Sequence, residues 1–175
     1  MDIAQSHFEL FGLPARFAIN AEALDAAYHR VQGQVHPDRF ASGSDAQRRV
    51  ALQWATRANE AYRTLREPVR RAQYLCSLRG VDVGGETDTA MPKEFLIEQM
   101  QWREALDDAA HAHDPVQLER LRSQLIAQRS ALLGEIQSLF DASGDVGACA
   151  AAVRKLMFLE KFGEDVARAF DTLEA

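Results

Sequence analysis

The chain has 175 residues, 47% of them hydrophobic, and a net charge of −6 at pH 7. A chain of this length can form one or two domains with a sizeable core. Its apolar runs are shorter than the roughly 18 residues that a membrane helix needs, and the segment that begins at Met1 has neither the basic patch nor the apolar core of a signal peptide. The sequence therefore lacks the pattern of an integral membrane protein. We expect a cytoplasmic location and no membrane partner.

The two cysteines, Cys76 and Cys149, have no second cysteine or histidine nearby at the spacing of metal ligands. We therefore expect two ordinary buried thiols, no metal site and no cofactor.

Charge is distributed unevenly along the chain. Residues 1–80 hold 11 basic residues, all of them arginine, and 8 acidic residues, whereas the remainder holds 9 and 18. The balance is +3 in the first part and −9 in the second, which suggests two modules with different partners. We do not expect a nucleic-acid partner, because a +3 module without a nucleic-acid motif is a weak electrostatic footprint.

The first predicted element is a short helix from about Ser6 to Gly12, with a glycine as its C-terminal stop. Asn20 is a good N-cap for a second, longer helix. Apolar residues then recur along one face of that helix, at Leu24, Tyr28, Val31 and Val35.

The tripeptide His36-Pro37-Asp38 interrupts this helical pattern. Pro37 lacks the backbone N–H that a continuing helix would use and disfavours helical geometry at His36, so the helix should end near Val35. Ser44 followed by Gln47 is typical of a capping box that begins a third helix, which leaves a loop over residues 37–43. The third helix has a matching stripe, at Ala51, Ala55, Ala58, Tyr62 and Leu65, so the two helices should form an antiparallel hairpin that ends in the loop.

The tripeptide alone has two other interpretations. Proline and aspartate are common turn formers, so it could be an ordinary turn. His36 and Asp38 could also be a catalytic base and its orienting carboxylate. Catalysis is disfavoured, because both residues belong to one loop and no serine or cysteine nucleophile lies close in sequence.

A fourth short helix is predicted from Pro68, at its first position, to Gly80. Residues 81–90 contain Gly84-Gly85 and no apolar periodicity, which indicates a linker. A helix from Pro92 to about Ala110 follows. Its core stripe consists of Phe95, Trp102, Leu106 and Ala109.

The same helix carries a second apolar stripe. At about 100° per residue, Leu96, Ile97 and Met100 project away from the core stripe, into the sector of Glu104, Asp107 and Asp108. Further helices could bury this stripe. The alternative is an exposed apolar patch with an acidic margin, which is typical of a partner site.

Two long helices complete the chain. Asp114-Pro115 indicates the N-cap and first turn of a helix through about Ala142, Ser143-Gly144 should break it, and Asp145 should cap a last helix to about Leu173. Long helices with short connections predict a three-helix bundle. The fold class is therefore all-α.

The sequence contains the motifs Phe11-Gly12-Leu13-Pro14, His36-Pro37-Asp38-Arg39-Phe40, Asn59-Glu60-Ala61-Tyr62 with Leu65, Pro68, Arg71-Ala72 and Tyr74-Leu75. Together these motifs resemble a J-domain, and the whole chain resembles the bacterial HscB-type J-domain co-chaperones of iron–sulfur cluster assembly. The resemblance is specific over about residues 5–80 and looser to the C-terminus. It implies a J-domain over residues 1–80, a linker over 81–90 and a scaffold-binding bundle over 91–175.

The resemblance also implies two binding sites. The loop of His36, Pro37 and Asp38 would dock on an HscA- or DnaK-type chaperone and stimulate its ATP hydrolysis, with Arg30 and Arg39 adding charge. The bundle would bind the iron–sulfur scaffold IscU through positions that match the family's site. These positions are Leu96, Ile97, Met100, Glu104 and Phe158, of which Phe158 lies off the main stripe of its helix and is expected to be exposed.

The chain departs from the family pattern in two places. The exposed face of the second helix offers mainly His29, Arg30 and Gln34, fewer charges than many J-domains carry, which suits a dedicated chaperone. Gln101 stands where the family can have an acidic residue. We expect an adaptor that is not itself an enzyme and that delivers the scaffold for cluster transfer; a J-domain co-chaperone for a different client is the alternative.

Overall fold

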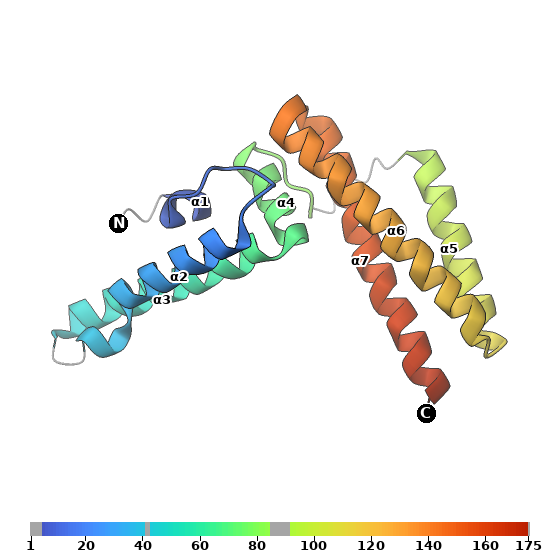
Figure 1. The fold of residues 1–175 in the computed structure, drawn as a ribbon, viewed down its shortest axis with the longest axis horizontal. Coiled ribbons are helices and arrows are strands. Elements are labelled where there is room, and N and C mark those ends of the chain that lie inside the picture. Colours follow the sequence, from blue (N-terminus) through green and yellow to red (C-terminus); the bar gives the residue numbers. More distant parts are fainter. Residues whose placement is uncertain (1–4, 41–42, 85–91, 175) are drawn as a thin grey trace. The chain divides into compact units, whose positions relative to one another are not determined.

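The computed structural model describes residues 5–40, 43–84 and 92–174. Every regular element within these ranges is helical, and the chain divides into two compact units, Met1–Arg79 and Gly80–Ala175 (Figure 1). Among the described residues, no helix has both the length and the apolar content needed to cross a membrane.

The N-terminal unit begins with two capped helices, α1 (His7–Phe11) and α2 (Ala21–Val35). The Ser6 hydroxyl accepts from the Glu9 amide, the Glu9 carboxylate accepts from the Ser6 amide, and Gly12 ends α1 with a left-handed φ of 66°. The Asn20 side chain accepts from the Ala23 amide at 3.0 Å and caps α2 as predicted. These local hydrogen bonds satisfy amides that a helix N-terminus otherwise leaves unpaired.

A 3-10 turn, η1 (Pro37–Phe40), separates α2 from α3 (Asp45–Arg66), and α4 (Pro68–Leu78) follows. The predicted capping box is present: Ser44 Oγ accepts from the Gln47 amide at 3.3 Å, and Gln47 Oε1 accepts from the Ser44 amide at 2.8 Å. Helices α2 and α3 lie side by side and antiparallel, with the turn at one end of the hairpin (Figure 1).

The core of this unit follows the predicted stripes. Three of the four predicted α2 residues are buried, and α3 contributes small side chains, so the two helices can approach closely. Tyr28 and Tyr62 are half-buried and stack with ring centroids 4.2 Å apart. The buried apolar residues of this unit include Phe8, Phe11, Phe17, Leu24, Val31, Val35, Ala51, Ala58, Ala61, Leu65 and Leu75.

Side-chain hydrogen bonds also join α2 to α3. Tyr62 Oη donates to Asp25 Oδ1 at 2.9 Å, and the Arg66 guanidinium donates to the same oxygen at 2.7 Å. The hydrogen bond from Tyr62, followed by those from Arg66, lowers the pKa of Asp25, and the same Tyr62–Asp25 bond raises the pKa of Tyr62. Asn59 Oδ1 accepts from Tyr28 Oη at 2.8 Å one turn further along the hairpin.

The C-terminal unit is a three-helix bundle, as predicted, of α5 (Lys93–His111), α6 (Pro115–Ser138) and α7 (Val146–Glu174). Asp114 Oδ1 accepts from the Val116 and Gln117 amides and caps α6. A π-helical turn, η2 (Leu139–Ser143), extends α6 until Gly144, whose φ of 71° redirects the chain into α7.

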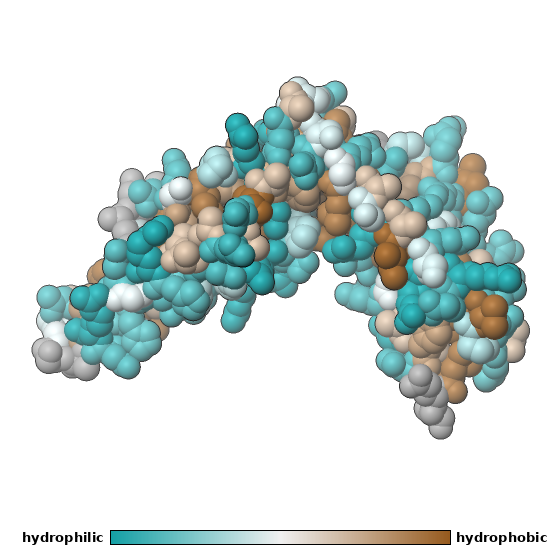
Figure 2. All heavy atoms as spheres, viewed as in Figure 1, coloured by the Kyte–Doolittle hydropathy of each residue, from teal (hydrophilic) through white to brown (hydrophobic). Residues whose placement is uncertain are grey.

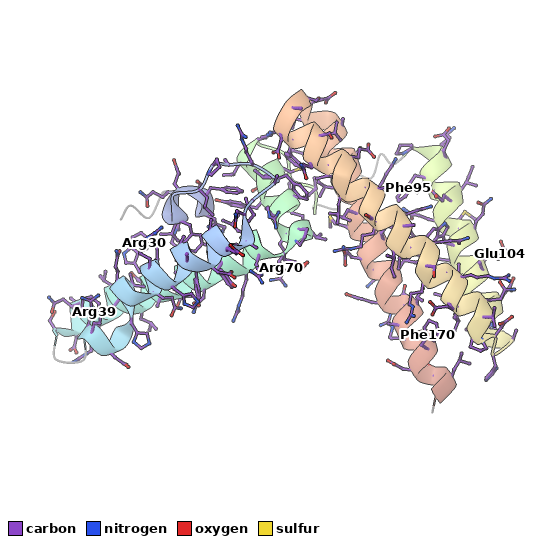
Figure 3. The ribbon with its side chains drawn as sticks, in the orientation of Figure 1. Arg30, Arg39, Arg70, Phe95, Glu104 and Phe170 are labelled. Atoms are coloured by element: carbon purple, nitrogen blue, oxygen red, sulfur yellow. The ribbon has the colours of Figure 1, made fainter. Side chains whose placement is uncertain are left out.

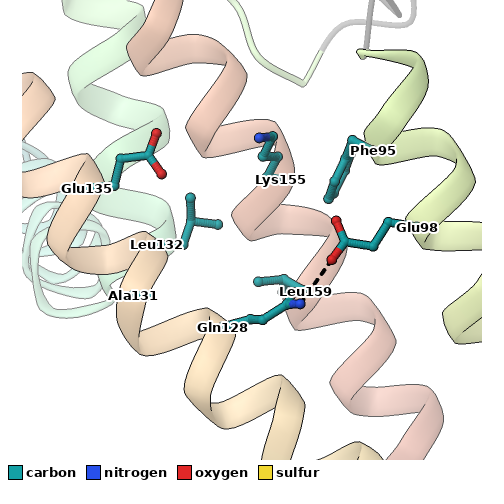
Figure 4. Close-up of a pocket in the computed structure, with 8 residues that line it drawn as sticks. All are labelled: Phe95, Glu98, Gln128, Ala131, Leu132, Glu135, Lys155 and Leu159. Carbon is teal, nitrogen blue, oxygen red and sulfur yellow. Dashed lines mark hydrogen bonds between the residues drawn. The ribbon is translucent and has the colours of Figure 1, made fainter.

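Large apolar side chains fill the centre of this bundle. The predicted stripe of α5 is buried except for Trp102, which is half-buried with its ring 5.1 Å from that of Phe162. A hydrogen bond of 2.9 Å from Gln128 Nε2 to Glu98 Oε1 crosses from α6 to α5 (Figure 4). Both cysteine side chains are buried, as expected. The main core residues are Phe95, Leu106, Ala109, Leu118, Leu121, Leu125, Leu132, Ile136, Leu156, Leu159, Phe162 and Val166.

Candidate functional site

The turn of His36-Pro37-Asp38 is exposed at the end of the α2–α3 hairpin. The exposed fractions of the His36 and Asp38 side chains are 52% and 90%. Hydrophilic side chains dominate this end of the hairpin (Figure 2). The Asp38 amide donates to His36 Nδ1 at 3.3 Å, so a neutral His36 ring carries its own N–H at Nε2. Much of the polar surface of both side chains is therefore open to solvent or to a partner.

This geometry does not suit a catalytic His–Asp pair. His36 Nδ1 lies 3.5 Å from Asp38 Oδ2, at the outer limit of a hydrogen bond, and it already accepts from the Asp38 amide. A base and its orienting carboxylate need a hydrogen bond from the ring N–H to the carboxylate. The turn is instead arranged to present donors and acceptors outward.

Arg39 stabilises the end of α2. In a continuing helix the amide of residue 37 would donate to the Gly33 carbonyl, but Pro37 has no N–H. The Arg39 guanidinium occupies that place, with Nη1 donating to the Gly33 oxygen at 2.6 Å. Arg39 lies at the turn end of the hairpin and Arg30 further along α2 (Figure 3). The side chains of His29, Arg30 and Gln34 are exposed, as expected for this face.

Sequence reasoning missed an apolar groove beside the turn. Its volume is about 280 Å³. Val50 and Trp54 lie one helical turn apart, outside the alanine stripe of α3. This spacing is the feature of the sequence from which a second apolar surface on α3 could have been predicted. The residues that line the groove are Val35, Phe40, Ala46, Gln47, Val50, Ala51 and Trp54.

The second stripe of α5 is exposed. The exposed fractions of Leu96, Ile97 and Met100 are 44%, 56% and 71%, and we call these three residues the apolar patch. Glu104 projects from the outer side of α5 (Figure 3), and Asp107 and Asp108 are exposed as well. The alternative in which further helices of this unit bury the stripe is therefore wrong, and an apolar surface with an acidic margin remains in contact with solvent.

Phe158 is half-buried, so the expectation that it is exposed was wrong. Its ring makes an edge contact with Phe95, with centroids 5.5 Å apart, and stacks on Phe162 at 5.9 Å. The reason is that α5 packs against α7 here and partly covers the ring. The Arg103 guanidinium lies 5.9 Å from the centre of the same ring. Arg103 is two helical turns from Leu96 on the same face of α5, so we expect Phe158 to lie at the border of the apolar patch rather than at its centre.

Metal ligation has no candidate in the part of the chain that the structure describes: nowhere do three His, Cys, Asp or Glu side chains come together as ligands. What the described residues do present is a polar turn with an apolar groove on one unit and the apolar patch on the other. Both are surfaces of the kind that bind other proteins.

Comparisons with known proteins agree with this architecture. Residues 91–167 match the family described as the HSCB C-terminal oligomerisation domain. The chain is 54% identical to the co-chaperone protein HscB homolog of Burkholderia thailandensis and 53% identical to that of Burkholderia multivorans, over 99% of each chain.

Solved structures show the same fold over nearly the whole chain. The chaperone HscB from Vibrio cholerae has a TM-score of 0.83 and 35% identity, covering 97% of this chain and 99% of its own. The human co-chaperone protein HscB has a TM-score of 0.88 and 26% identity, covering 96% and 83%. The all-α architecture of a J-type unit followed by a helical bundle is thus confirmed, and the chain belongs to the HscB family of co-chaperones.

Proposed function

We propose that this protein is an adaptor that stimulates ATP hydrolysis by an HscA- or DnaK-type chaperone and delivers the iron–sulfur scaffold IscU to it. The observation that carries this proposal is the exposed His36-Pro37-Asp38 turn, at the end of a J-type hairpin in a member of the HscB family. We assign the J-domain to residues 1–80, a linker to 81–90 and the scaffold-binding bundle to 91–175. The split of the chain after Arg79 supports this division.

The turn supplies polar contacts for the chaperone. Asp38 offers a carboxylate that is almost fully exposed, and His36 keeps its Nε2 N–H available. Arg39 at the turn and the exposed Arg30 further along α2 add positive charge, which would attract an acidic chaperone surface (Figure 3). Arg39 uses one nitrogen to hold the Gly33 carbonyl, and a guanidinium has further N–H groups for a partner. Pro37 ends α2 and thereby sets the direction in which the turn leaves the helix.

The apolar patch supplies area for the scaffold. Burying a side chain such as Leu96, Ile97 or Met100 completely is worth about 1.5–3 kcal/mol, and these side chains are now 44–71% exposed. Glu104 at the margin would orient a basic region of the scaffold, and Phe158 at the border would add aromatic contact where it is not covered by α5. The cluster carried by the scaffold is cargo, and it needs no ligand from this chain.

The adaptor is not itself an enzyme. His36 and Asp38 lie on a surface turn in contact with water, whereas a general base is tuned by burial or by a hydrogen-bonded partner. The relatives are named co-chaperones, which fits a regulator of another protein's ATPase. A different client in place of IscU is the alternative function, and titration with the purified apo scaffold separates the two.

Replacing Asp38 with asparagine tests the chaperone half of the proposal. Asp38→Asn and His36→Gln should abolish stimulation of the chaperone ATPase, because the charge or donor pattern of the turn is lost. Glu22→Gln, an exposed acidic residue at the other end of α2, is the matched control and should stimulate normally. The thermal midpoints of the turn variants should stay close to that of the wild type, since such surface changes cost within about 0.5 kcal/mol. Unchanged stimulation by both turn variants would contradict the proposal that this turn docks on the chaperone.

A further inference from the structure

The apolar groove beside the turn has no part in the function proposed above. Val35 is the last residue of α2, Phe40 is the last residue of η1, and Val50 and Trp54 face the groove from α3. Three consecutive elements of the chain therefore build one concave apolar surface.

The polar group of Gln47, which lines the groove, is already used in the capping box of α3. Gln47 lines the groove, but its Oε1 accepts from the Ser44 amide at 2.8 Å in the capping box. Its aliphatic part is what remains for the groove. Val50 is an apolar residue, yet it is 51% exposed and directly follows Arg48 and Arg49 on the surface of α3. A partner that covers this exposed apolar surface gains binding free energy, because the surface is removed from water.

The size of the groove indicates what kind of group it holds. A volume of about 280 Å³ is slightly below the roughly 300–1,000 Å³ typical of small-molecule sites. One or two aliphatic side chains of a protein would fill it. Phe40 and Trp54 are both half-buried in its walls, and aromatic residues are enriched at the centres of protein interfaces.

The position of the groove indicates which protein supplies that side chain. Val35 directly precedes His36, and Phe40 belongs to the same four-residue turn as Asp38. A specific interface occupies about 800 Å² and 20–30 residues on each partner, far more than a tripeptide offers. A protein seated on the turn therefore extends over its surroundings, and the groove is the apolar surface that adjoins the turn in sequence on both sides.

We propose that this groove receives an aliphatic side chain of the same DnaK-type chaperone that docks on the His36-Pro37-Asp38 turn. This inference rests on the proposed function. The turn supplies oriented polar contacts, and the groove adds affinity and selects chaperones that carry an aliphatic side chain at the facing position. Polar contacts fix the orientation of a complex, while burial of an apolar anchor slows its dissociation.

Two matched variants on α3 test the groove. Val50→Gln places an amide at the mouth of the groove, and Leu52→Gln makes the same kind of change at a residue that is 59% exposed and does not line it. Stimulation of the purified chaperone ATPase is measured against co-chaperone concentration. Because about half of the Val50 side chain remains to be buried, Val50→Gln should raise the half-maximal concentration about three- to tenfold with the maximal rate unchanged. Leu52→Gln should behave as the wild type.

Asp38→Asn measured beside them separates the two proposals. If Asp38→Asn stimulates normally, the proposed docking turn fails and the groove inference fails with it. If Asp38→Asn is inactive while Val50→Gln and Leu52→Gln both match the wild type, the groove inference alone is overturned. Sedimentation of the wild type and Val50→Gln proteins covers the remaining occupant: self-association that Val50→Gln abolishes, with ATPase stimulation unchanged, would assign the groove to a second copy of the chain. Unchanged thermal midpoints show that the variants remain folded.

Discussion

The two units of this protein are held together in different ways. In the N-terminal hairpin the buried residues of α3 include three alanines, and the helices are joined by hydrogen bonds such as those from Tyr62 and Arg66 to Asp25. In the bundle, α6 and α7 meet along leucine, isoleucine and phenylalanine side chains. The hairpin thus combines a core of small side chains with a cluster of polar cross-links. The bundle has a core of large side chains, with single cross-links such as those from Gln128 to Glu98 and from Arg129 to Glu160.

The proposed binding surfaces differ in the same way. The turn on the hairpin presents a carboxylate, an imidazole and guanidinium groups, which fix orientation and respond to charge. The apolar patch on α5 presents area, which gives affinity with little directional preference. The charge balance of +3 in residues 1–80 and −9 beyond them agrees with separate partners. We infer that each surface can be weakened without loss of the other.

The largest expected effect separates core from patch within the bundle. Phe162 is 1% exposed, and its ring packs on Trp102 and Phe158, so Phe162→Ala should lower the free energy of unfolding by about 3–5 kcal/mol. Met100 is 71% exposed, and Met100→Ala should change it by less than about 0.5 kcal/mol. Urea denaturation followed by circular dichroism measures both. Equal losses would mean that the patch is part of the core.

Acid should destabilise the hairpin through Asp25. Its hydrogen bonds to Tyr62 and Arg66 lower the pKa of Asp25 below the ordinary value. An unfolded aspartate has a pKa of about 3.9, so this stabilisation is complete above that pH and is lost as the pH falls through the lower folded pKa. As the pH falls below about 4 and through the lower folded pKa, the melting temperature of the hairpin should therefore fall more in the wild type than in Asp25→Asn.

Tryptophan fluorescence can follow this titration in the hairpin alone. The chain has two tryptophans, Trp54 in the first unit and Trp102 in the second. In a Trp102→Phe background, Trp54 reports the melting of the hairpin at each pH. The same pH slope with and without Asp25→Asn would contradict a stabilising role for the Tyr62–Asp25–Arg66 contacts.

The smallest expected effect concerns Gln101, an exposed residue on the acidic side of α5. Gln101→Glu adds a charge at the margin of the apolar patch, and a single exposed charge pair is worth about 0.2–1 kcal/mol. Scaffold affinity should therefore rise about two- to fivefold at low salt, and the gain should shrink as salt screens the charge. Gln124→Glu, an exposed position on α6, is the control for a general charge effect. An equal gain in scaffold affinity in both variants would show that Gln101 does not lie in the interface.

Local patterns predicted the helices well, because each helix boundary depends on neighbouring residues. The Ser44–Gln47 capping box, the Asp114 N-cap and the helix break at Gly144 all lie where the sequence indicated. The outward direction of Leu96, Ile97 and Met100 also followed from helical periodicity and is confirmed by their exposure.

The features that sequence reasoning missed depend on contacts between elements. Phe158 is off the stripe of its own helix, but Phe95 from α5 covers part of its ring, and no pattern within α7 reveals that. The groove requires Phe40 of the turn and Val50 and Trp54 of α3 to face each other. The bond from Arg39 to the Gly33 carbonyl depends on how η1 folds back on α2.

We propose that the apolar patch binds the scaffold independently of the His36-Pro37-Asp38 turn. The most direct test is a variant with Leu96, Ile97 and Met100 all replaced by alanine, measured by calorimetric titration with apo scaffold and by chaperone ATPase stimulation without scaffold. We predict scaffold affinity at least about tenfold weaker, because apolar anchors dominate interface energies, with an unchanged melting temperature and normal stimulation. Full scaffold affinity in a folded variant, or loss of stimulation without scaffold, would contradict the account.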